Sequence, residues 1–346
     1  MMQNHLFLEE LVASISRELK DLPAASLALA NLPCLNVHAN IRLGPGAFLI
    51  KPAASRPEQA VLDQLLNNQL YKQVNIIPCS VLMSRADMKS ILLIWSREVP
   101  SSQYKLFRIP LLLLNMLLDA PRPIFPSETT VGSRDSGNTH KMAEQRLHDM
   151  PPALSGLIVP CGRRKTSSGE KSLEEDLTEF RGRLEMAEAG DTALTATLDL
   201  TLSGDSKWGF PDQLRTRLIE YTVALESLIL DQETELSYRF ALRLSVLLAP
   251  IGDRVKFFED ARKVYKLRSS AVHAGAREVK VSDVEVESTR RLLRLSILRY
   301  VALKHAGLKR KDIVGRLDLA LLSQSAGQEL AEVLTDEDLW PIEAVD

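Results

Sequence analysis

The chain has 346 residues, of which 45% are hydrophobic and 25% charged, and its formal net charge is -2 at pH 7. This composition is typical of a globular protein in water, and the length favours two domains. Aromatic residues make up only 5%, which argues against a broad stacking platform for single-stranded nucleic acid. No signal-peptide pattern opens the sequence, and the longest apolar run (109–118) is too short to cross a bilayer. We therefore expect a cytoplasmic protein without membrane contact.

Charge is unevenly distributed along the chain. Residues 205–320 hold 22 Lys and Arg against 16 Asp and Glu, whereas 321–346 hold seven acidic residues and no basic one. A basic module beside an acidic tail is compatible with a polyanionic ligand. Cys34, Cys79 and Cys161 are far apart in sequence, so we predict no disulfide framework, no metal site and no cofactor.

The first 120 residues combine helical and strand patterns. Helical periods occur at 6–20, 56–71 and 111–118, and strand patterns at 37–43, 47–50, 74–77, 90–95 and 105–109. The glycines of Gly44-Pro45-Gly46 lack the rest of any nucleotide-binding fingerprint and are interpreted as a hairpin turn. These patterns predict a mixed α/β domain.

The next stretch, residues 121–192, is rich in Pro, Ser, Thr and Gly and predicts a loop-rich segment with short helices at 142–150 and 173–189. Within it, the basic segment 161–171 is predicted to be a mobile loop. Leucine and alanine then alternate with threonine and aspartate over 194–202, which predicts a strand that pairs with the N-terminal sheet.

From Trp208 onward every pattern is helical. We predict helices at 211–230, 236–248, 257–273, 285–307 and 312–322. Ser282-x-x-Glu285 is a capping box that begins the fourth of them. Long helices joined by short loops predict an antiparallel bundle.

The candidate site lies at the end of the third of these helices, in Tyr265-Lys-Leu-Arg-Ser-Ser-Ala-Val-His-Ala-Gly275. Arg268 supplies a permanent planar charge that suits phosphate, and His273 accepts or donates a proton near neutral pH. Such a pair can act on a phosphodiester without a metal. Residues five apart on an ideal helix differ by about 140° in azimuth. Arg268 and His273 therefore need either a distorted backbone or a second protomer to meet at one phosphate.

A purely structural explanation of the same residues stays open. Arg268 could form an ion pair with Glu226 or Glu259. His273 could be a helix-terminal residue whose ring favours the carboxyl end of the helix dipole.

In this helical setting the motif resembles the HEPN superfamily (higher eukaryotes and prokaryotes nucleotide-binding domain), and its residues are similar to those of the Apea-like branch. Two upstream strings, Ala224-Leu-Glu226-Ser-Leu and Glu235-Leu-Ser-Tyr-Arg239-Phe-Ala-Leu-Arg243, also resemble that branch. The resemblance covers residues from about 205 to 320.

The resemblance implies a metal-independent endoribonuclease that works as a homodimer, with the motifs of two protomers lining one cleft. Arg268 would bind the scissile phosphate, and His273 would be the general base or acid for attack by the ribose 2′-OH. The products would carry 2′,3′-cyclic phosphate and 5′-OH ends. Substrate-binding or supporting roles are implied for Ser269, Ser270, Glu226 and Arg239.

The expected architecture is an α+β N-terminal domain (1–204) that acts as a sensor or regulatory domain, an all-α HEPN-like bundle of about five helices (205–322) and an acidic tail (323–346). We expect a defence or toxin effector that cleaves RNA, tRNA among the candidates, with an activator or inhibitor acting on the N-terminal domain. A second hypothesis is a non-catalytic HEPN dimerisation or RNA-binding adaptor. A third, an enzyme with its site in the N-terminal domain, has no supporting group of residues.

Overall fold

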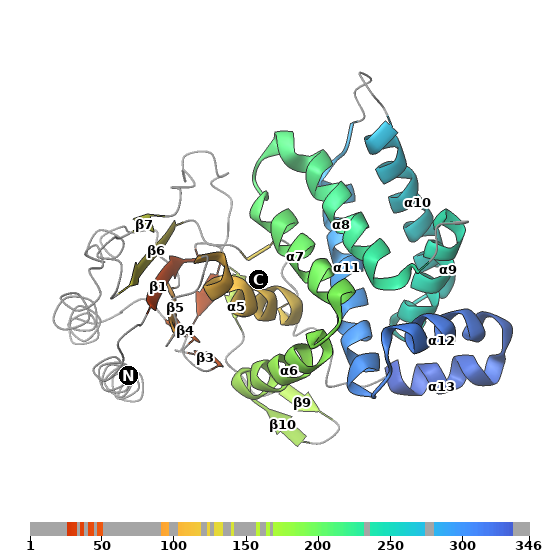
Figure 1. The fold of residues 1–346 in the computed structure, drawn as a ribbon, viewed down its shortest axis with the longest axis horizontal. Coiled ribbons are helices and arrows are strands. Elements are labelled where there is room, and N and C mark those ends of the chain that lie inside the picture. The colour runs from red at the N-terminus through yellow and green to blue at the C-terminus, as the bar shows by residue number, and fades with distance from the viewer. Residues whose placement is uncertain are drawn as a thin grey trace.

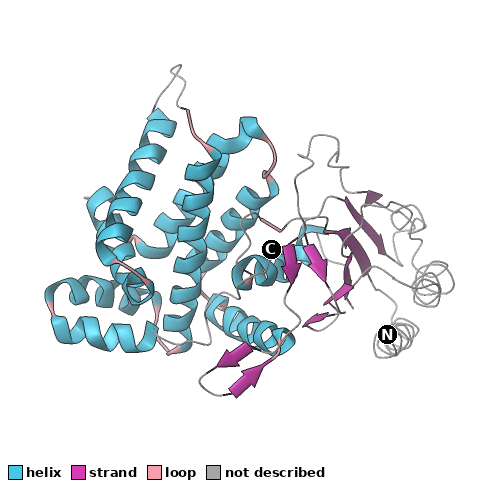
Figure 2. Cartoon of the chain, turned by 180° about the vertical axis from the view of Figure 1, so that it is seen from behind, coloured by secondary structure: helices cyan, strands magenta, loops and turns pink. Residues whose placement is uncertain are grey.

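The computed structural model describes residues 26–32, 35–37, 41–44, 47–50, 91–96, 103–118, 123–124, 128–133, 140–141, 157–159, 164–166, 169–231, 236–273 and 280–334. Most of these residues are helical, and Figure 1 shows the helices gathered beside a small sheet. Figure 2 shows the same arrangement from behind. None of the described helices is long and apolar enough to cross a membrane. The elements predicted at 6–20, 56–71, 74–77 and 142–150 lie outside the described residues, as do the three cysteines and Gly275.

The larger sheet has six strands in the order β3-β4-β5-β1-β6-β7, and every pair is antiparallel. The strands are β1 (Ser26–Asn31), β3 (Ile41–Gly44), β4 (Ala47–Ile50), β5 (Ile91–Ser96), β6 (Glu128–Ser133) and β7 (His140–Lys141). In the β3–β4 pair, Gly44 lies opposite Ala47, as the predicted hairpin requires. β5 confirms the strand predicted at 90–95.

Two smaller strand pairs lie apart from this sheet. β2 (Leu35–Val37) pairs in parallel with β8 (Leu157–Val159), and β9 (Arg164–Thr166) pairs antiparallel with β10 (Gly169–Lys171). The prediction of a mobile loop over 161–171 is therefore wrong for residues 164–166 and 169–171, which form β9 and β10. Only two residues separate these strands, which is the length of a tight hairpin connection.

Helix α5 (Gln103–Leu117) corrects a second prediction. The strand expected at 105–109 is the first part of this helix, and the helix expected at 111–118 is its continuation. Four successive leucines, 111–114, are all buried, because the helix is covered on every side. The Asn115 side chain is satisfied at this depth: its Nδ2 donates to the Leu111 carbonyl (2.9 Å).

Helix α7 (Thr192–Ser206) shows that the strand predicted at 194–202 is wrong. Asp191 caps the helix, with its carboxylate accepting from the Leu194 amide (3.0 Å). Leu194, Leu198 and Leu202 recur at every fourth residue and are fully buried. The alternating sequence therefore also carries a helical stripe, and α7 packs on α8 instead of joining the sheet.

The remaining helices are α6 (Leu173–Glu188), α8 (Leu214–Ile229), α9 (Leu236–Leu248), α10 (Arg254–His273), α11 (Asp283–His305), α12 (Arg310–Leu322) and α13 (Gln324–Leu334). Short 3-10 turns at Pro211–Gln213 and Ala249–Ile251 precede α8 and α10. The five helices predicted between 211 and 322 are confirmed as α8 to α12, and α6 confirms the helix predicted at 173–189. The predicted capping box of Ser282 and Glu285 begins α11.

Helix α11 is the centre of the bundle and contacts α6, α8, α9, α12 and α13. Figure 1 shows α8 crossing α11, with α7 on one side of α11 and α9 with α10 on the other. α13 lies in the segment expected to be an acidic tail, and it is anchored there by buried Leu330 and Leu334. α6 precedes residue 204 and α7 spans it, yet both helices share this core with α8 and α11. The domain limit at residue 204 stays a prediction.

A buried polar network ties α5, α7, α8 and α11 together. Arg290 on α11 donates to Asp205 Oδ1 on α7 (3.1 Å) and to Asn115 Oδ1 on α5 (3.0 Å). Tyr221 on α8 donates to the same Asp205 oxygen (2.7 Å). A buried charge that loses its partner is costly, so these bonds favour a single arrangement of the four helices.

Candidate functional site

The candidate site lies on α10. Asp253 caps its first turn, with Oδ1 accepting from two backbone amides (2.8 and 3.4 Å). Ala261, Val264 and Ala271 are the buried residues of this helix, and their spacing marks its inward face. Arg268 follows Val264 by four residues and precedes Ala271 by three. It therefore belongs to the inward face of α10.

On that face Arg268 meets Glu226 of α8. Arg268 Nη2 donates to Glu226 Oε2 over 3.4 Å, and the two side chains are 24% and 17% exposed. Arg268 Nε and Glu226 Oε1 are both buried and make no hydrogen bond with the described residues. The ion pair is thus long and single, and each partner keeps unused hydrogen-bonding capacity.

Burial governs the protonation of this pair. Desolvation raises the pKa of the Glu226 carboxyl, and the nearby Arg268 charge offsets only part of that effect. The pKa of Tyr265 is also raised, first by burial and then by the Glu226 charge, while Arg268 acts in the opposite direction. Glu226, Tyr265 and Arg268 therefore form one electrostatically linked group where α8 and α10 meet.

His273 lies elsewhere on the helix. It is the last residue of α10 and is exposed. Because α10 is continuous from Arg254, the distorted backbone considered for this motif is not present. A regular helix sets His273 about 140° from Arg268 in azimuth and about 7.5 Å along the axis. Within one chain, then, the arginine faces inward and the histidine faces solvent.

The other predicted site residues lie at separate positions on α10 and α9. Ser269 is half-buried and Ser270 exposed. Arg239 is half-buried on α9. Among the predicted site residues, a hydrogen bond between described residues joins only Glu226 and Arg268. Of the two carboxylates considered as partners for Arg268, the structure selects Glu226.

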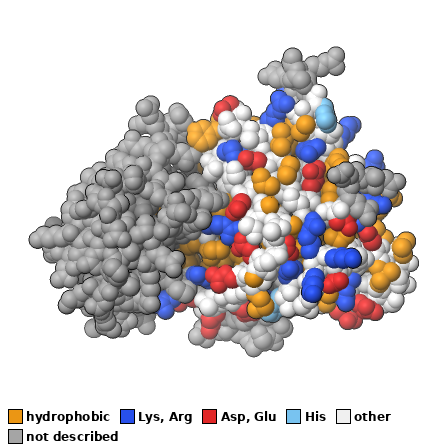
Figure 3. All heavy atoms as spheres, viewed as in Figure 1, with side chains coloured by type: hydrophobic (Ala, Val, Ile, Leu, Met, Phe, Trp, Pro, Cys, Tyr) orange, Lys and Arg blue, Asp and Glu red, His pale blue; other side chains and the backbone are white. Residues whose placement is uncertain are grey.

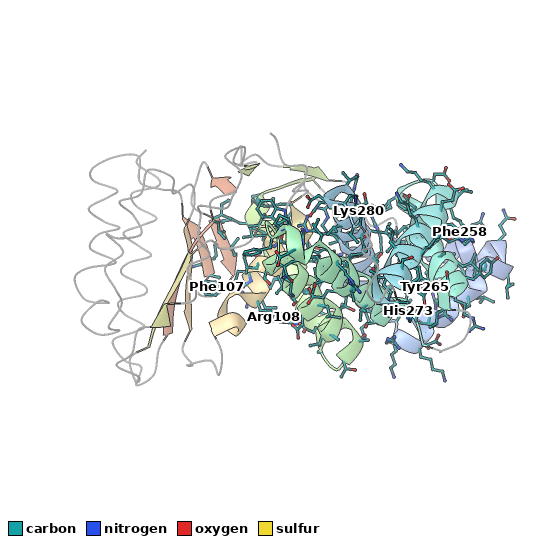
Figure 4. The ribbon with its side chains drawn as sticks, turned by 90° about the horizontal axis from the view of Figure 1, so that it is seen from above. Phe107, Arg108, Phe258, Tyr265, His273 and Lys280 are labelled. Atoms are coloured by element: carbon teal, nitrogen blue, oxygen red, sulfur yellow. The ribbon has the colours of Figure 1, made fainter. Side chains whose placement is uncertain are left out.

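An aromatic group beside the site was not anticipated from the sequence. The Tyr238 ring of α9 meets Phe258 of α10 edge to face, with centroids 6.0 Å apart. The rings of Phe240 on α9 and Tyr265 on α10 also meet, with centroids 5.5 Å apart and a tilt of 52° between their planes. The four aromatic positions are scattered over 28 residues of sequence, so only the packing of α9 on α10 brings them together. Figure 4 shows Phe258, Tyr265 and His273 in the same part of the molecule, far from Phe107 and Arg108.

Several buried arginines also escaped the sequence patterns. Arg243 is the clearest example: its Nε and Nη2 both donate to the Asp318 carboxylate (2.7 Å each). Its Nη1 donates to Asp231 Oδ1 (2.7 Å) and to the Ile229 carbonyl (2.9 Å). All three guanidinium nitrogens of Arg243 therefore donate to groups within the protein. This residue links α9 to α12 and to the end of α8.

Within the described ranges, His, Cys, Asp and Glu side chains form no cluster of three or more that could hold a metal ion. No protein-family model matches this chain, and no curated protein or solved structure does so either. The site is therefore interpreted from its own geometry and from the motif at the end of α10.

Proposed function

We propose that the protein is a metal-independent endoribonuclease of the HEPN type that acts as a homodimer. The observation that carries the proposal is the state of Arg268. It is held at the α8–α10 junction by one long contact to Glu226, and its side chain stays 24% exposed. An arginine with spare donors can bind a phosphate.

A second protomer completes the proposed site. Arg268 faces inward and His273 outward on one continuous helix, so a phosphate held by Arg268 of one chain is best reached by His273 of another. Two such motifs facing each other would provide two histidines in one cleft. This arrangement is also what the resemblance to HEPN proteins implies.

The proposed reaction needs one proton acceptor and one proton donor. Neutral His273 of one protomer takes the proton of the ribose 2′-OH, and O2′ attacks the adjacent phosphorus. The bond to O5′ breaks, and the protonated His273 of the other protomer gives its proton to O5′. Arg268 stabilises the charge that develops on the phosphate oxygens, and Ser269 and Ser270 supply hydroxyl groups beside it. The products carry a 2′,3′-cyclic phosphate and a 5′-OH.

The roles of the remaining parts belong to the same proposal. Glu226 and Arg239 are polar supports of the bundle around α10. The N-terminal α+β region would act as a sensor or regulatory domain on which an activator or inhibitor works. The biological setting we propose is a defence or toxin effector whose substrate is cellular RNA, tRNA among the candidates.

A second candidate function is a non-catalytic HEPN adaptor that dimerises or binds RNA. The observation that favours it is the same Arg268–Glu226 ion pair, since an arginine paired to a buried carboxylate also serves as a purely structural link. The two candidates differ in whether His273 is needed for any activity.

The test is incubation of the full-length protein with total RNA and with purified tRNA in EDTA, beside Arg268→Ala and His273→Ala. We expect cleavage that leaves cyclic-phosphate ends and that both substitutions abolish. Because His273 is exposed, His273→Ala should change the free energy of unfolding by no more than about 0.5 kcal/mol. Cleavage that survives His273→Ala would sink the proposed site, and a folded wild type that binds but never cleaves RNA would support the adaptor.

A further inference from the structure

We propose that the exposed face of α10, together with Tyr238 of α9, binds single-stranded RNA and leads it to His273. The surface, here called the α10 track, consists of Phe258, Arg262, Lys266 and His273 with Tyr238 beside Phe258. This inference rests on the proposed function for the choice of RNA. It adds the residues that bind the strand and the kind of strand they select.

The first observation is the direction of the side chains around α10. At 100° per residue, Arg262, Lys266 and His273 lie within about 40° of one another, whereas Arg268 lies about 120° or more away. Arg262, Lys266 and His273 are exposed, while the Arg268 side chain is half-buried. His273 therefore lies on the same face of α10 as Arg262 and Lys266, and Arg268 lies on another face.

The second observation is the charge of this face. Residues 261–273 hold four Lys or Arg and no Asp or Glu, and of these cations Arg262 and Lys266 lie on the face of His273, whereas Arg268 lies on the inward face. Lys263 lies 4.0 Å from Glu285, but no ion pair among the described residues engages Arg262 or Lys266. Exposed Glu259 lies on the same face of α10, about 60° in azimuth from Arg262, and forms no ion pair with described residues. Figure 3 shows Lys and Arg side chains, with a His beside them, around the upper part of α10. Arg262 and Lys266 are thus available for phosphates.

The third observation is the aromatic pair at the start of the track. Tyr238 is 58% exposed although it contacts Phe258, so much of its ring is open to solvent. Arg262 lies over the Phe258 ring with its guanidinium carbon 5.8 Å from the centroid, which holds the cation close to the aromatic pair. An exposed aromatic ring beside cations suits an unpaired base next to its phosphate.

The length of the track sets how much of an RNA strand it can bind. Fifteen residues of helix separate Phe258 from His273, a rise of about 22 Å. Along it come first the aromatic pair, then Arg262, then Lys266 one turn further and finally His273. A strand whose base stacks on Tyr238 would thus present later phosphates to the two cations and a ribose to His273. A duplex keeps its bases stacked inside and cannot use Tyr238 in this way, so the track favours single strands.

The inference is tested by binding of a fluorescent single-stranded 2′-O-methyl RNA, whose lack of free 2′-OH groups prevents cleavage, to the full-length protein at several salt concentrations. Arg262→Ala with Lys266→Ala should weaken binding and reduce the slope of log affinity against log salt by about 1.4, or about 0.7 for each lost phosphate contact. The matched control is Lys311→Ala with Arg316→Ala, which removes the same charge from exposed positions of α12.

The aromatic part has its own test. Tyr238→Ala should weaken single-strand binding by roughly tenfold, Tyr238→Phe should retain it, and a duplex of the same sequence should be bound more weakly by the wild type and be insensitive to Tyr238→Ala. Equal binding of single strand and duplex, or a salt slope in the Arg262 and Lys266 variant like that of the α12 control, would overturn the inference.

Binding and cleavage separate this inference from the proposed function. If binding depends on the track but no RNA is cleaved, the track stands and the ribonuclease proposal fails. If RNA is cleaved in dependence on Arg268 and His273 while the track variant binds and cleaves like its control, only the track is refuted.

Discussion

Arg268 of α10 and Glu226 of α8 form a single hydrogen-bonded ion pair of 3.4 Å. Each side chain also has a buried polar atom that makes no hydrogen bond with the described residues. Arg243, in contrast, donates two bonds of 2.7 Å to the Asp318 carboxylate. The two arginines lie in the same bundle but are held differently. Arg243 is fully engaged within the protein, whereas Arg268 is held by one long bond and its side chain is 24% exposed.

The first prediction concerns competition for Arg268. Glu226→Gln removes the negative charge that a phosphate must displace while keeping the shape of the side chain. Since such a partly exposed pair is worth up to about 1 kcal/mol, binding of the 2′-O-methyl RNA should tighten by roughly threefold to fivefold. Fluorescence anisotropy measures the change. Weaker binding by Glu226→Gln would mean that Glu226 positions Arg268 and does not compete for it.

A second prediction follows from the raised pKa of Glu226. Because burial raises this pKa above its usual value of 4.5, the folded protein holds the proton more tightly than the unfolded chain does. The stabilising contribution is fully present below the usual value and is lost as the pH rises through the raised pKa. Urea unfolding of wild type and Glu226→Gln between about pH 4 and about pH 7 measures this. The stability of the wild type relative to the variant should fall with rising pH, and a flat difference would contradict the assignment.

A third prediction concerns the close approach of α7 to α8. A Cβ on Gly204 would lie 2.4 Å from the Tyr221 ring, whose hydroxyl is held by Asp205. Gly204→Ala should therefore cost about 1–3 kcal/mol of unfolding free energy through overpacking. Gly182→Ala on α6 is the control, since nothing lies within 4 Å of its added Cβ, and it should stabilise by about 0.4–1 kcal/mol. Chemical denaturation compares them, and equal effects would argue against the tight α7–α8 contact.

The fourth prediction tests the buried network. Among the described side chains, Arg290→Met would leave the buried Asp205 carboxylate with a hydrogen bond from the Tyr221 hydroxyl alone, which should cost about 3–5 kcal/mol of unfolding free energy. The neighbouring Arg291 is exposed, so Arg291→Met should stay within about 0.5 kcal/mol of the wild type. Adding Asp205→Asn to Arg290→Met should recover part of the loss. If the double variant loses the sum of both single effects, the two residues are not coupled.

The helical region was predictable because its signals are local. In α8 to α12 the apolar residues recur with the helical period, and caps such as Ser282 with Glu285 act over three residues. The strand predicted at 194–202 failed because Leu194, Leu198 and Leu202 satisfy both a period of two and a spacing of four. Asp191, three residues before the first of these leucines, is the local signal that could have resolved the ambiguity.

The site was only partly predictable for a similar reason. Arg268 and His273 stand out in sequence, and their spacing on a helix already requires them to point apart. Glu259 lies nine residues from Arg268 on the same predicted helix, about 13.5 Å along the axis and on its opposite side, so the helix prediction already excluded it as a partner. That Glu226 is the partner could not be predicted, because it depends on which face of α10 meets α8. Tyr238 gave no signal at all, since its contact with Phe258 arises only when α9 packs on α10.

By itself, then, the sequence determined the helices of the C-terminal region and the position of the Arg–His motif at the end of α10, because both depend on residues within a few positions of one another. The tertiary structure alone decided that α7 packs on α8 and does not join the sheet, that Arg268 pairs with Glu226, and that Tyr238 of α9 lies beside Phe258 of α10. Those outcomes depend on contacts between segments far apart in the chain, where burial and charge pairing outweigh local preference.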